Sequence, residues 1–208
     1  MEESAPPAPN CELYLVRHAQ SEWNASGRWQ GQADPPLSPD GRVQASVLVV
    51  RLEEELAGIP VTGLVCSDLG RARETAAELG RKFGLIPVSD PELRELDIGE
   101  WSGLQRAEIV ARDPELLARF EANDPNARPP GGETRRELRH RARWAIRRIA
   151  NGDPWGRVVI VSHLGLIRAL LPGAEPKNAE FVRVSAADAV TRRLRFESGE
   201  EGTGEGPL

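Results

Sequence analysis

The sequence is poor in cysteine and in long apolar runs, and each scarcity excludes a class of protein. Its 208 residues include two cysteines, Cys11 and Cys66. They form no CxxC pair and have no metal-ligand spacing, so no metal site is expected. Both thiols are predicted to be reduced and structural, and we expect a cytoplasmic protein. No apolar run approaches the roughly 18 residues that a membrane span needs, so no membrane association is expected.

Basic charge is also in the minority, and almost all of it is arginine. The chain carries 27 Lys and Arg against 32 Asp and Glu, and Lys82 and Lys177 are its only lysines. A general nucleic-acid binder needs a basic surface for phosphates, so the net charge of −5 excludes this class. The Arg-rich segment 134–148 has an apolar stripe at helical spacing, which predicts a solvated face for its arginines and for His140. The stripe consists of Leu138, Ala142, Ala145, Ile146 and Ile149.

The composition is typical of one globular domain with short polar ends. Hydrophobic residues make up 39% of the chain and charged residues 28%, which suits a single core at this length. Residues 1–10 are acidic and Pro-rich and do not resemble a targeting signal, so they are predicted to be disordered. The Gly- and Glu-rich residues 198–208 cannot bury enough apolar surface to become ordered. The domain is therefore expected at 11–197, with a lid-like insertion at 104–132.

Strand and helix patterns alternate along this domain. Strands are expected at 12–17, 61–68 and 157–163, inside 85–96, and near 179–184 and 190–196. Helices are expected at 38–57, 72–83, 134–148 and 164–171, and in 104–122 with a break at Pro114. This alternation predicts a three-layer α/β/α sandwich with a mostly parallel central sheet. In such folds, ligands bind beyond the carboxyl ends of the strands.

Three of these strands end in residues that suit a phosphate group. Arg17 and His18 end the first strand, Arg71 follows the second, and His163 ends the strand at 157–163. Taken singly, each is more often a structural histidine or a surface ion-pair partner. Parallel strands deliver their last residues to one edge of the sheet, however, so the four should converge there. Guanidinium groups match phosphate oxygens, and the helix start at Arg71 adds N–H groups that favour an anion.

The stretch RHAQSEWN, residues 17–24, closely resembles the signature of the histidine phosphatase superfamily, the phosphoglycerate-mutase-like proteins. Later blocks of that family are matched in the same order by GRWQGQADPPLSPDGRVQA, CSDLGRARETA, LRELDIGEWSG, PPGGET and VSHLGLIR. The resemblance covers about residues 12–196. It implies the phosphoglycerate-mutase-like fold and a reaction that passes through a phosphohistidine.

The resemblance implies a role for each matched residue. His18 aligns with the nucleophile, and Glu95 aligns with the proton donor to the leaving oxygen. The positions that align with the phosphate pocket and substrate are Arg17, Asn24, Gln30, Arg71 and His163. A neutral imidazole needs no strong base to attack phosphorus, and Arg, His and Asn can stabilise the charge without a metal or cofactor. Glu95 must be protonated in the first step and act as a base toward water in the second.

Three positions depart from the family pattern. Ala19 and Leu164 replace the glycines that usually follow the two histidines, and Ser102 replaces a common acid. None of these changes removes a proposed catalytic group. Leu164 matters most, because it either narrows the substrate pocket or packs inside the helix start.

Two groups of neighbouring residues leave alternatives open. The carboxylates that rival Glu95 are Glu92, Asp97 and Glu100, and each is expected to be a solvated loop residue. The aromatic residues that either line the substrate mouth or pack in the core are Trp23, Trp29 and Trp101.

Within the family, two features favour a phosphatase over a mutase. Gln32 follows Gly31 where mutases carry a tryptophan, and about 27 residues separate Gly103 from Gly131, where mutases have a longer insertion. We therefore expect a phosphomonoesterase for small sugar phosphates or phosphoglycerate-like metabolites. The alternatives are a cofactor-dependent phosphoglycerate mutase, a protein phosphohistidine or phosphotyrosine phosphatase, and a non-catalytic phospholigand-binding protein. An oligomer is compatible with the sequence.

Overall fold

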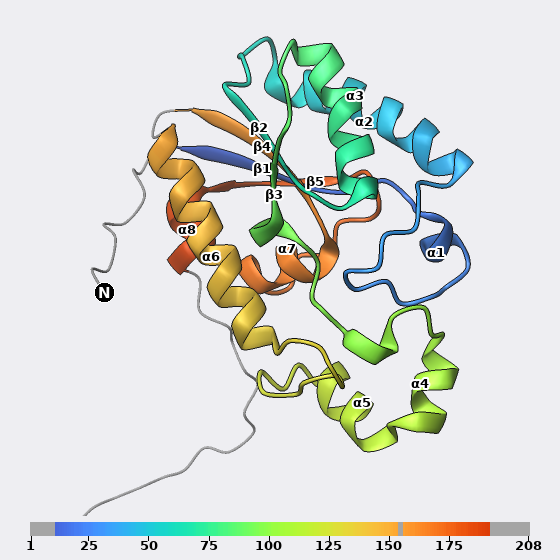
Figure 1. The fold of residues 1–208 in the computed structure, drawn as a ribbon. Helices are drawn as coiled ribbons and strands as arrows, with labels where there is room; N and C mark the ends of the chain where they lie inside the picture. The colour runs from blue at the N-terminus through green and yellow to red at the C-terminus, as the bar shows by residue number, and fades with distance from the viewer. Residues whose placement is uncertain (1–10, 154–155, 192–208) are drawn as a thin grey trace, which may run out of the picture.

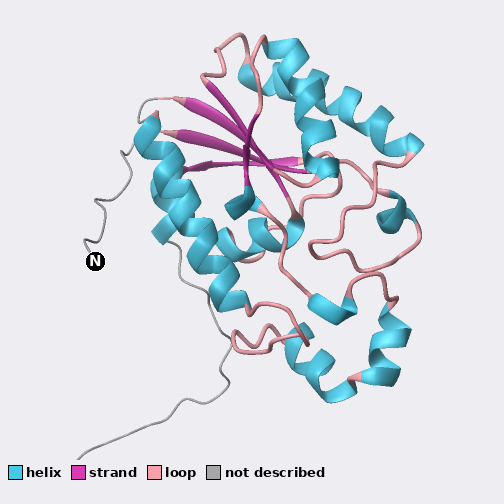
Figure 2. Ribbon diagram, in the orientation of Figure 1, coloured by secondary structure: helices cyan, strands magenta, loops and turns pink. Residues whose placement is uncertain are grey.

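The computed structural model of the chain describes residues 11–153 and 156–191. Within these ranges, one sheet lies between two layers of helices (Figure 1 and Figure 2). Its strands are β1 (Glu12–Arg17), β2 (Gly63–Ser67), β3 (Val88–Asp90), β4 (Arg157–Ser162) and β5 (Phe181–Ser185). Their order is β3-β2-β4-β1-β5, with β5 antiparallel to β1 and the other pairs parallel. The predicted α/β/α sandwich with a mostly parallel sheet is confirmed.

Helices cover both faces of this sheet. The α-helices are α1 (Glu22–Ala25), α2 (Pro39–Leu56), α3 (Gly70–Phe83), α4 (Arg106–Arg112), α5 (Pro114–Glu121), α6 (Arg135–Gly152), α7 (Leu164–Leu170) and α8 (Ala186–Thr191). Short 3-10 helices occur at η1 (Pro91–Leu93) and η2 (Gly99–Trp101). In Figure 1, α2 and α3 lie on one side of the sheet and α6, α7 and α8 on the other. No helix in the described ranges has both the length and the apolar character to cross a membrane.

Local signals in the sequence explain several helix ends. The hydroxyl of Ser38 accepts a hydrogen bond from the N–H of Gly41 at 3.0 Å, and Pro39 occupies the first position of α2. α4 ends before Pro114, which begins α5, so the predicted break is confirmed. α4 and α5 extend away from the sheet in Figure 1.

The strand predicted near 190–196 is wrong for the two of its residues that the structure describes. A strand is predicted near 190–196, but Val190 and Thr191 belong to α8, and residues 192–196 lie outside the described residues. A short apolar run does not distinguish a strand from a buried helix, and the alanines that precede Val190 favour the helix. The disorder predicted for 1–10 and 198–208 also concerns residues outside the described ranges.

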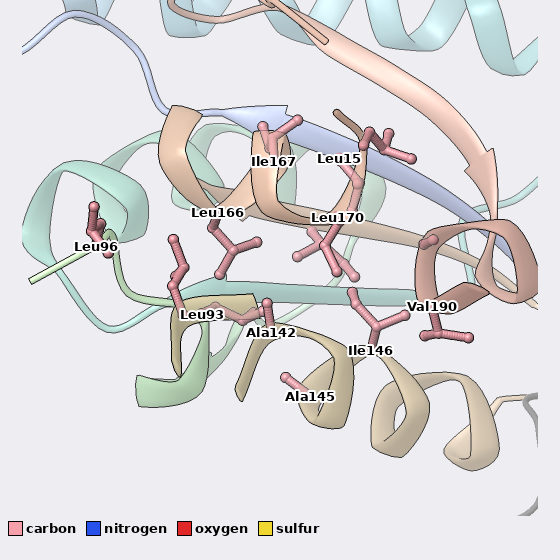
Figure 3. Close-up of a cluster of buried hydrophobic side chains, with 14 of the residues drawn as sticks. Leu15, Leu93, Leu96, Ala142, Ala145, Ile146, Leu166, Ile167, Leu170 and Val190 are labelled. Carbon is pink, nitrogen blue, oxygen red and sulfur yellow. The ribbon is translucent and has the colours of Figure 1, made fainter. Parts of the chain in front are cut away.

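The apolar stripe predicted for α6 forms the core on its side of the sheet. Ala142, Ala145 and Ile146 are all 0% exposed. Figure 3 shows this stripe facing side chains of α7, among them Leu166 and Leu170. The alanines leave room for the two helices to approach closely.

We predict that Ile146→Ala lowers the free energy of unfolding by about 2–5 kcal/mol, because it leaves a cavity at a fully buried position. Urea unfolding followed by circular dichroism measures this loss. Val43→Ala is the control, since Val43 is 64% exposed and the change should cost about 0.5 kcal/mol or less. Equal losses in the two variants would contradict the assigned packing.

Candidate active site

The register between β1 and β4 brings the two predicted histidines together. Arg17 lies opposite Ser162 in this parallel pair, so His18 and His163 leave the sheet at the same level. Their ring centroids are 5.0 Å apart, with 59° between the ring planes. His18 is buried and lines a cavity of about 330 Å³. The predicted convergence at the carboxyl edge of the sheet is therefore observed for these two residues.

One hydrogen bond determines the tautomer of His18. Its Nδ1 lies 2.7 Å from the carbonyl oxygen of Ala19. A carbonyl can only accept, so Nδ1 carries the proton and Nε2 carries the lone pair. Burial lowers the pKa of His18 well below its usual value, and the positive charge of Arg71 lowers it further. The imidazole is therefore neutral at pH 7, as a nucleophilic histidine must be.

His163 lies beside His18 but deeper in the protein. It is 0% exposed and is not among the residues that line the cavity. Burial and the charge of Arg71 also lower its pKa well below the usual value. Neither ring nitrogen has a hydrogen-bond partner among the described residues. Its predicted contact with the phosphate stays a prediction.

Arg17 and Arg71 both line the cavity, as predicted. Arg17 donates from Nη1 to the carbonyl oxygen of Pro176 at 3.1 Å. Arg71 is fully buried and donates to the carbonyl oxygens of Ala33 and Gly31, at 2.6 and 2.8 Å. In both arginines, Nε is buried without a partner among the described residues. Burial lowers the pKa of each, but a guanidinium starts so high that both keep their charge.

The start of α3, next to Arg71, does not offer its first N–H group to an anion as predicted. The N–H of Gly70 donates to both carboxyl oxygens of Asp34, at 2.8 and 2.9 Å. This first amide of α3 is thus bound to an internal carboxylate and is not open to a ligand. The expectation that backbone N–H groups there assist an anion is wrong for this amide, whereas Arg71 itself lines the cavity.

Asn24 and Gln30 line the cavity with oriented amides. Oδ1 of Asn24 accepts from the N–H of Ser21 at 3.1 Å and from Nδ2 of Asn178 at 3.2 Å. Oε1 of Gln30 accepts from the hydroxyl of Ser21 at 2.7 Å. Because both amide oxygens are engaged, the NH₂ groups remain as donors. Asn178 was not predicted; it also donates to the carbonyl of His18 at 3.0 Å and so ties these residues together.

Glu95 is held against the start of α7. Its carboxyl oxygens accept from the N–H of Leu96 at 2.7 Å and from the N–H of Gly165 at 3.0 Å. A Cβ at position 165 would lie 2.2 Å from Oε1 of Glu95, so the approach requires glycine. Among the four carboxylates considered, Glu95 alone lines the cavity; the others are Glu92, Asp97 and Glu100.

Arg141 holds the backbone around Glu95, a role that was not predicted. It donates to the carbonyl oxygens of Glu92, Arg94 and Glu95 at 2.8, 2.7 and 2.8 Å. It also pairs with Glu133 at 2.5 Å. The predicted solvated face is therefore wrong for Arg141, whose side chain is 16% exposed. Arg141 borders the apolar stripe of α6, where a long side chain can lie along the protein instead of reaching into water.

The residues that line the cavity decide between the alternatives that the sequence left open for Leu164 and the tryptophans. Leu164 and Trp29 line the cavity. Trp101 is fully buried and donates to a carboxyl oxygen of Asp113 at 2.7 Å, so it belongs to the core. Trp23 does not line the cavity. The predicted exposure of His140 is confirmed.

Guanidiniums outnumber carboxylates in the lining of the cavity, and three of them, Arg28, Arg71 and Arg168, pair with carboxylates outside this lining. The ionic side chains of the lining are one carboxylate, Glu95, and the five guanidiniums of Arg17, Arg28, Arg71, Arg135 and Arg168. This set suits a phosphate group, which offers two negative charges and several acceptor oxygens. Within the described ranges, no three His, Cys, Asp or Glu side chains gather as a metal-binding group.

A neutral imidazole, several guanidiniums and a carboxyl group are the groups that phosphoryl transfer through a histidine requires, and here they meet at the edge of a parallel sheet. Comparison with known proteins agrees with this class. Residues 13–202 match the family model of the histidine phosphatase superfamily (branch 1), and the chain belongs to this superfamily. The predicted family and its phosphoglycerate-mutase-like fold are confirmed.

Named relatives include both phosphatases and mutases. Glucosyl-3-phosphoglycerate phosphatase of Mycobacterium tuberculosis is 38% identical over 166 residues, which cover 76% of this chain and 72% of that protein. A probable phosphoglycerate mutase of Photorhabdus laumondii is 34% identical over 172 residues, covering 81% and 78%. A solved mycobacterial glucosyl-3-phosphoglycerate phosphatase in complex with VO3 superposes with a TM-score of 0.75 at 35% identity, covering 84% and 92%.

We predict that acid destabilises the fold through its buried histidines. Their pKa values are lowered in the folded state, so the unfolded state binds more protons as the pH falls below about 6.5. The free energy of unfolding should then fall by up to about 1.4 kcal/mol per pH unit for each histidine. Urea unfolding between pH 7 and 5.5 measures the slope, and His163→Gln should remove about half of it. An unchanged slope in this variant would contradict the assignment.

Proposed function

We propose that this chain is a metal-independent phosphatase that hydrolyses small phosphomonoesters through a phosphohistidine on His18. The orientation of His18 carries the proposal: its proton is held on Nδ1 by the Ala19 carbonyl, which leaves Nε2 as a neutral nucleophile in a cationic cavity. A cavity of about 330 Å³ suits a small ligand. The named phosphatases among its relatives support the same activity.

In the first step, Nε2 of His18 attacks phosphorus and the bond between phosphorus and the alcohol oxygen breaks. Arg17, Arg71 and the NH₂ group of Asn24 hold the nonbridging oxygens and stabilise their charge. Glu95, in its protonated form, gives its proton to the leaving oxygen, because an alkoxide leaves poorly. The carbonyl of Ala19 keeps the ring in place as it becomes positively charged.

In the second step, water attacks the phosphohistidine from the side that the alcohol has left. Glu95 now accepts a proton from this water, and the bond between phosphorus and Nε2 breaks. Inorganic phosphate leaves, and both His18 and Glu95 return to their starting forms. A phosphoryl oxygen would also accept a hydrogen bond from the buried N–H of His163, which supports its assignment to the phosphate pocket.

A cytoplasmic location remains part of this proposal. Cys11 and Cys66 are both free and buried, which suits a reducing compartment. Burial raises the pKa of the Cys11 thiol to about 11, so this group is a packing residue and not a nucleophile.

We predict that His18→Ala lowers phosphate release from p-nitrophenyl phosphate by on the order of 10³-fold or more, because the covalent route is lost. The native enzyme should form an acid-labile phosphoenzyme, and the variant should not. The same assay with 3-phosphoglycerate distinguishes a mutase: isomerisation without phosphate release would overturn the phosphatase assignment. Full activity in the variant would overturn the mechanism.

We also predict a selective defect in Gly165→Ala. Because the new Cβ would displace the carboxyl group of Glu95, kcat for an alkyl phosphate should fall by about 10- to 100-fold. The loss should be smaller with p-nitrophenyl phosphate, whose leaving group needs no proton. Gly152→Ala is the matched control, since a Cβ there meets nothing within 4 Å. Equal losses on both substrates would show that Gly165 does not act through Glu95.

A further inference from the structure

Two peptide groups follow His18, and each is held by a side chain from the helices on one side of the sheet. The N–H of Ala19 donates to Oγ1 of Thr75 in α3 at 3.0 Å. The N–H of Gln20 donates to Oε1 of Gln44 in α2 at 3.0 Å. α2 and α3 lie on the same side of the sheet (Figure 1). Neither Thr75 nor Gln44 lines the cavity around His18, so neither is placed to contact a ligand there.

The hydrogen bond to Gln44 determines the direction of the carbonyl that binds His18. A peptide group is planar and trans, so the C=O of Ala19 and the N–H of Gln20 point in opposite directions from one rigid unit. The carbonyl oxygen lies 2.7 Å from Nδ1 of His18, and the N–H is bound by Gln44. Only the oxygen of the Gln44 amide can accept from this N–H, which assigns the orientation of the amide. Rotation of the peptide group away from His18 would therefore break both hydrogen bonds.

Thr75 holds the preceding peptide group in the same way. Its hydroxyl accepts from the N–H of Ala19 and donates to the carbonyl oxygen of Arg71 at 2.8 Å, so the direction of its proton is assigned. The carbonyl of the same peptide group, that of His18, accepts from Nδ2 of Asn178 at 3.0 Å. Ala19 and Thr75 are both 0% exposed, so bulk water does not compete for the hydrogen bond between them.

The start of α2 holds the next part of the backbone. The N–H of Ser38 donates to the carbonyl oxygen of Gln20 at 2.9 Å. A Cβ on Gly41 would lie 2.0 Å from the same oxygen, so this approach requires glycine. Gln44 lies about one turn further along α2, which places its amide next to the N–H of Gln20. The backbone from His18 to Gln20 is thus anchored on α2 and α3.

The demand on the Ala19 carbonyl rises during phosphoryl transfer. When Nε2 of His18 bonds to phosphorus, the ring becomes positively charged and its Nδ1 proton becomes a stronger donor. A carbonyl whose own peptide N–H is hydrogen-bonded is a better acceptor, because linked hydrogen bonds polarise one another. The bond from Gln20 to Gln44 therefore both orients the Ala19 carbonyl and strengthens its hold on the charged ring.

We propose that Gln44 and Thr75 are positioning residues for the nucleophile: they hold the two peptide groups of Ala19 so that His18 keeps its proton on Nδ1 and presents Nε2 to phosphorus. This inference rests on the proposed phosphohistidine mechanism and assigns to it two residues outside the cavity. Both act through Ala19. Their loss should therefore slow the attack on phosphorus and leave the binding of phosphate unchanged.

The test uses Gln44→Met, which keeps the length of a half-buried side chain and removes its acceptor oxygen. In rapid-quench experiments with p-nitrophenyl phosphate, the rate of phosphoenzyme formation should fall by about 10- to 100-fold, the range expected for a hydrogen bond to a group that becomes charged. The inhibition constant of inorganic phosphate should stay within about threefold of the native value, because Arg17 and Arg71 are unchanged. Gln44→Glu keeps an acceptor oxygen and should restore most of the rate.

Three further variants serve as controls. Val47→Met places a methionine on the outer side of the same helix, where Val47 is 44% exposed, and should keep the native rate. Thr75→Val should show the same defect as Gln44→Met, whereas Thr75→Ser should keep most of the rate, because its hydroxyl remains. A native rate in Gln44→Met would overturn the proposal, as would a defect that Gln44→Glu shares in full. Rates are referred to the amount of phosphoenzyme formed, so an unfolded fraction does not alter them.

Nitrogen NMR of the imidazole separates this proposal from the phosphatase assignment. In protein labelled with 15N-histidine, the His18 signals are those that His18→Ala removes. At pH 7 the native ring should show a protonated Nδ1 and an unprotonated Nε2, and Gln44→Met should move the two signals toward each other as the other tautomer becomes populated.

This NMR result in a protein without phosphatase activity would support the positioning role and overturn the proposed function alone. A native ring with its proton on Nε2, or ring signals that Gln44→Met leaves unchanged, would overturn the positioning role even in an active phosphatase.

Discussion

The register between β1 and β4 is the constraint on which the site depends. With Arg17 opposite Ser162, both histidines leave the sheet together and their rings meet at 5.0 Å. A slip of one residue would turn every side chain of β1 to the other face and remove His18 from the cavity. β1 is buried on both faces, with Leu13 and Leu15 in one core and Tyr14 and Val16 in the other. A slip would exchange the side chains around which each core is closely packed, so packing fixes the register. The geometry of the candidate site thus depends on the packing of the core.

Much of the fold and part of the site were predictable because they follow from local patterns. Short runs of neighbouring residues predict the buried strands, the capped helices and the break at Pro114. Arg17, His18 and Arg71 could be placed at one edge because parallel strands end together. The strand predicted near 190–196 was wrong at Val190, which belongs to α8. A short apolar run fits a buried helix as well as a strand, so the pattern alone could not decide between them.

The remaining site residues act over long sequence distances, and no local pattern encodes them. Arg141 binds carbonyl oxygens 46 to 49 positions away, and Asn178 reaches His18 across 160 positions. In these contacts the partners are backbone atoms, which every residue has, so the sequence contains no matching signal for them. Gly165 matters only because Glu95 approaches it. The roles of these residues can be recognised only from the tertiary structure, in which their partners are brought close to them.

The near absence of lysine has a consequence for how such a site can be controlled. Every cation that lines the cavity around His18 is an arginine, and Lys82 and Lys177 are not among its lining residues. A guanidinium stays protonated throughout the physiological range, so the attraction for anions hardly changes with cellular pH. It is also a poor target for acetyl-transferring enzymes and reactive acyl metabolites, which modify amino groups. Covalent inactivation of this cavity would instead require a reagent that modifies arginine, such as a dicarbonyl compound.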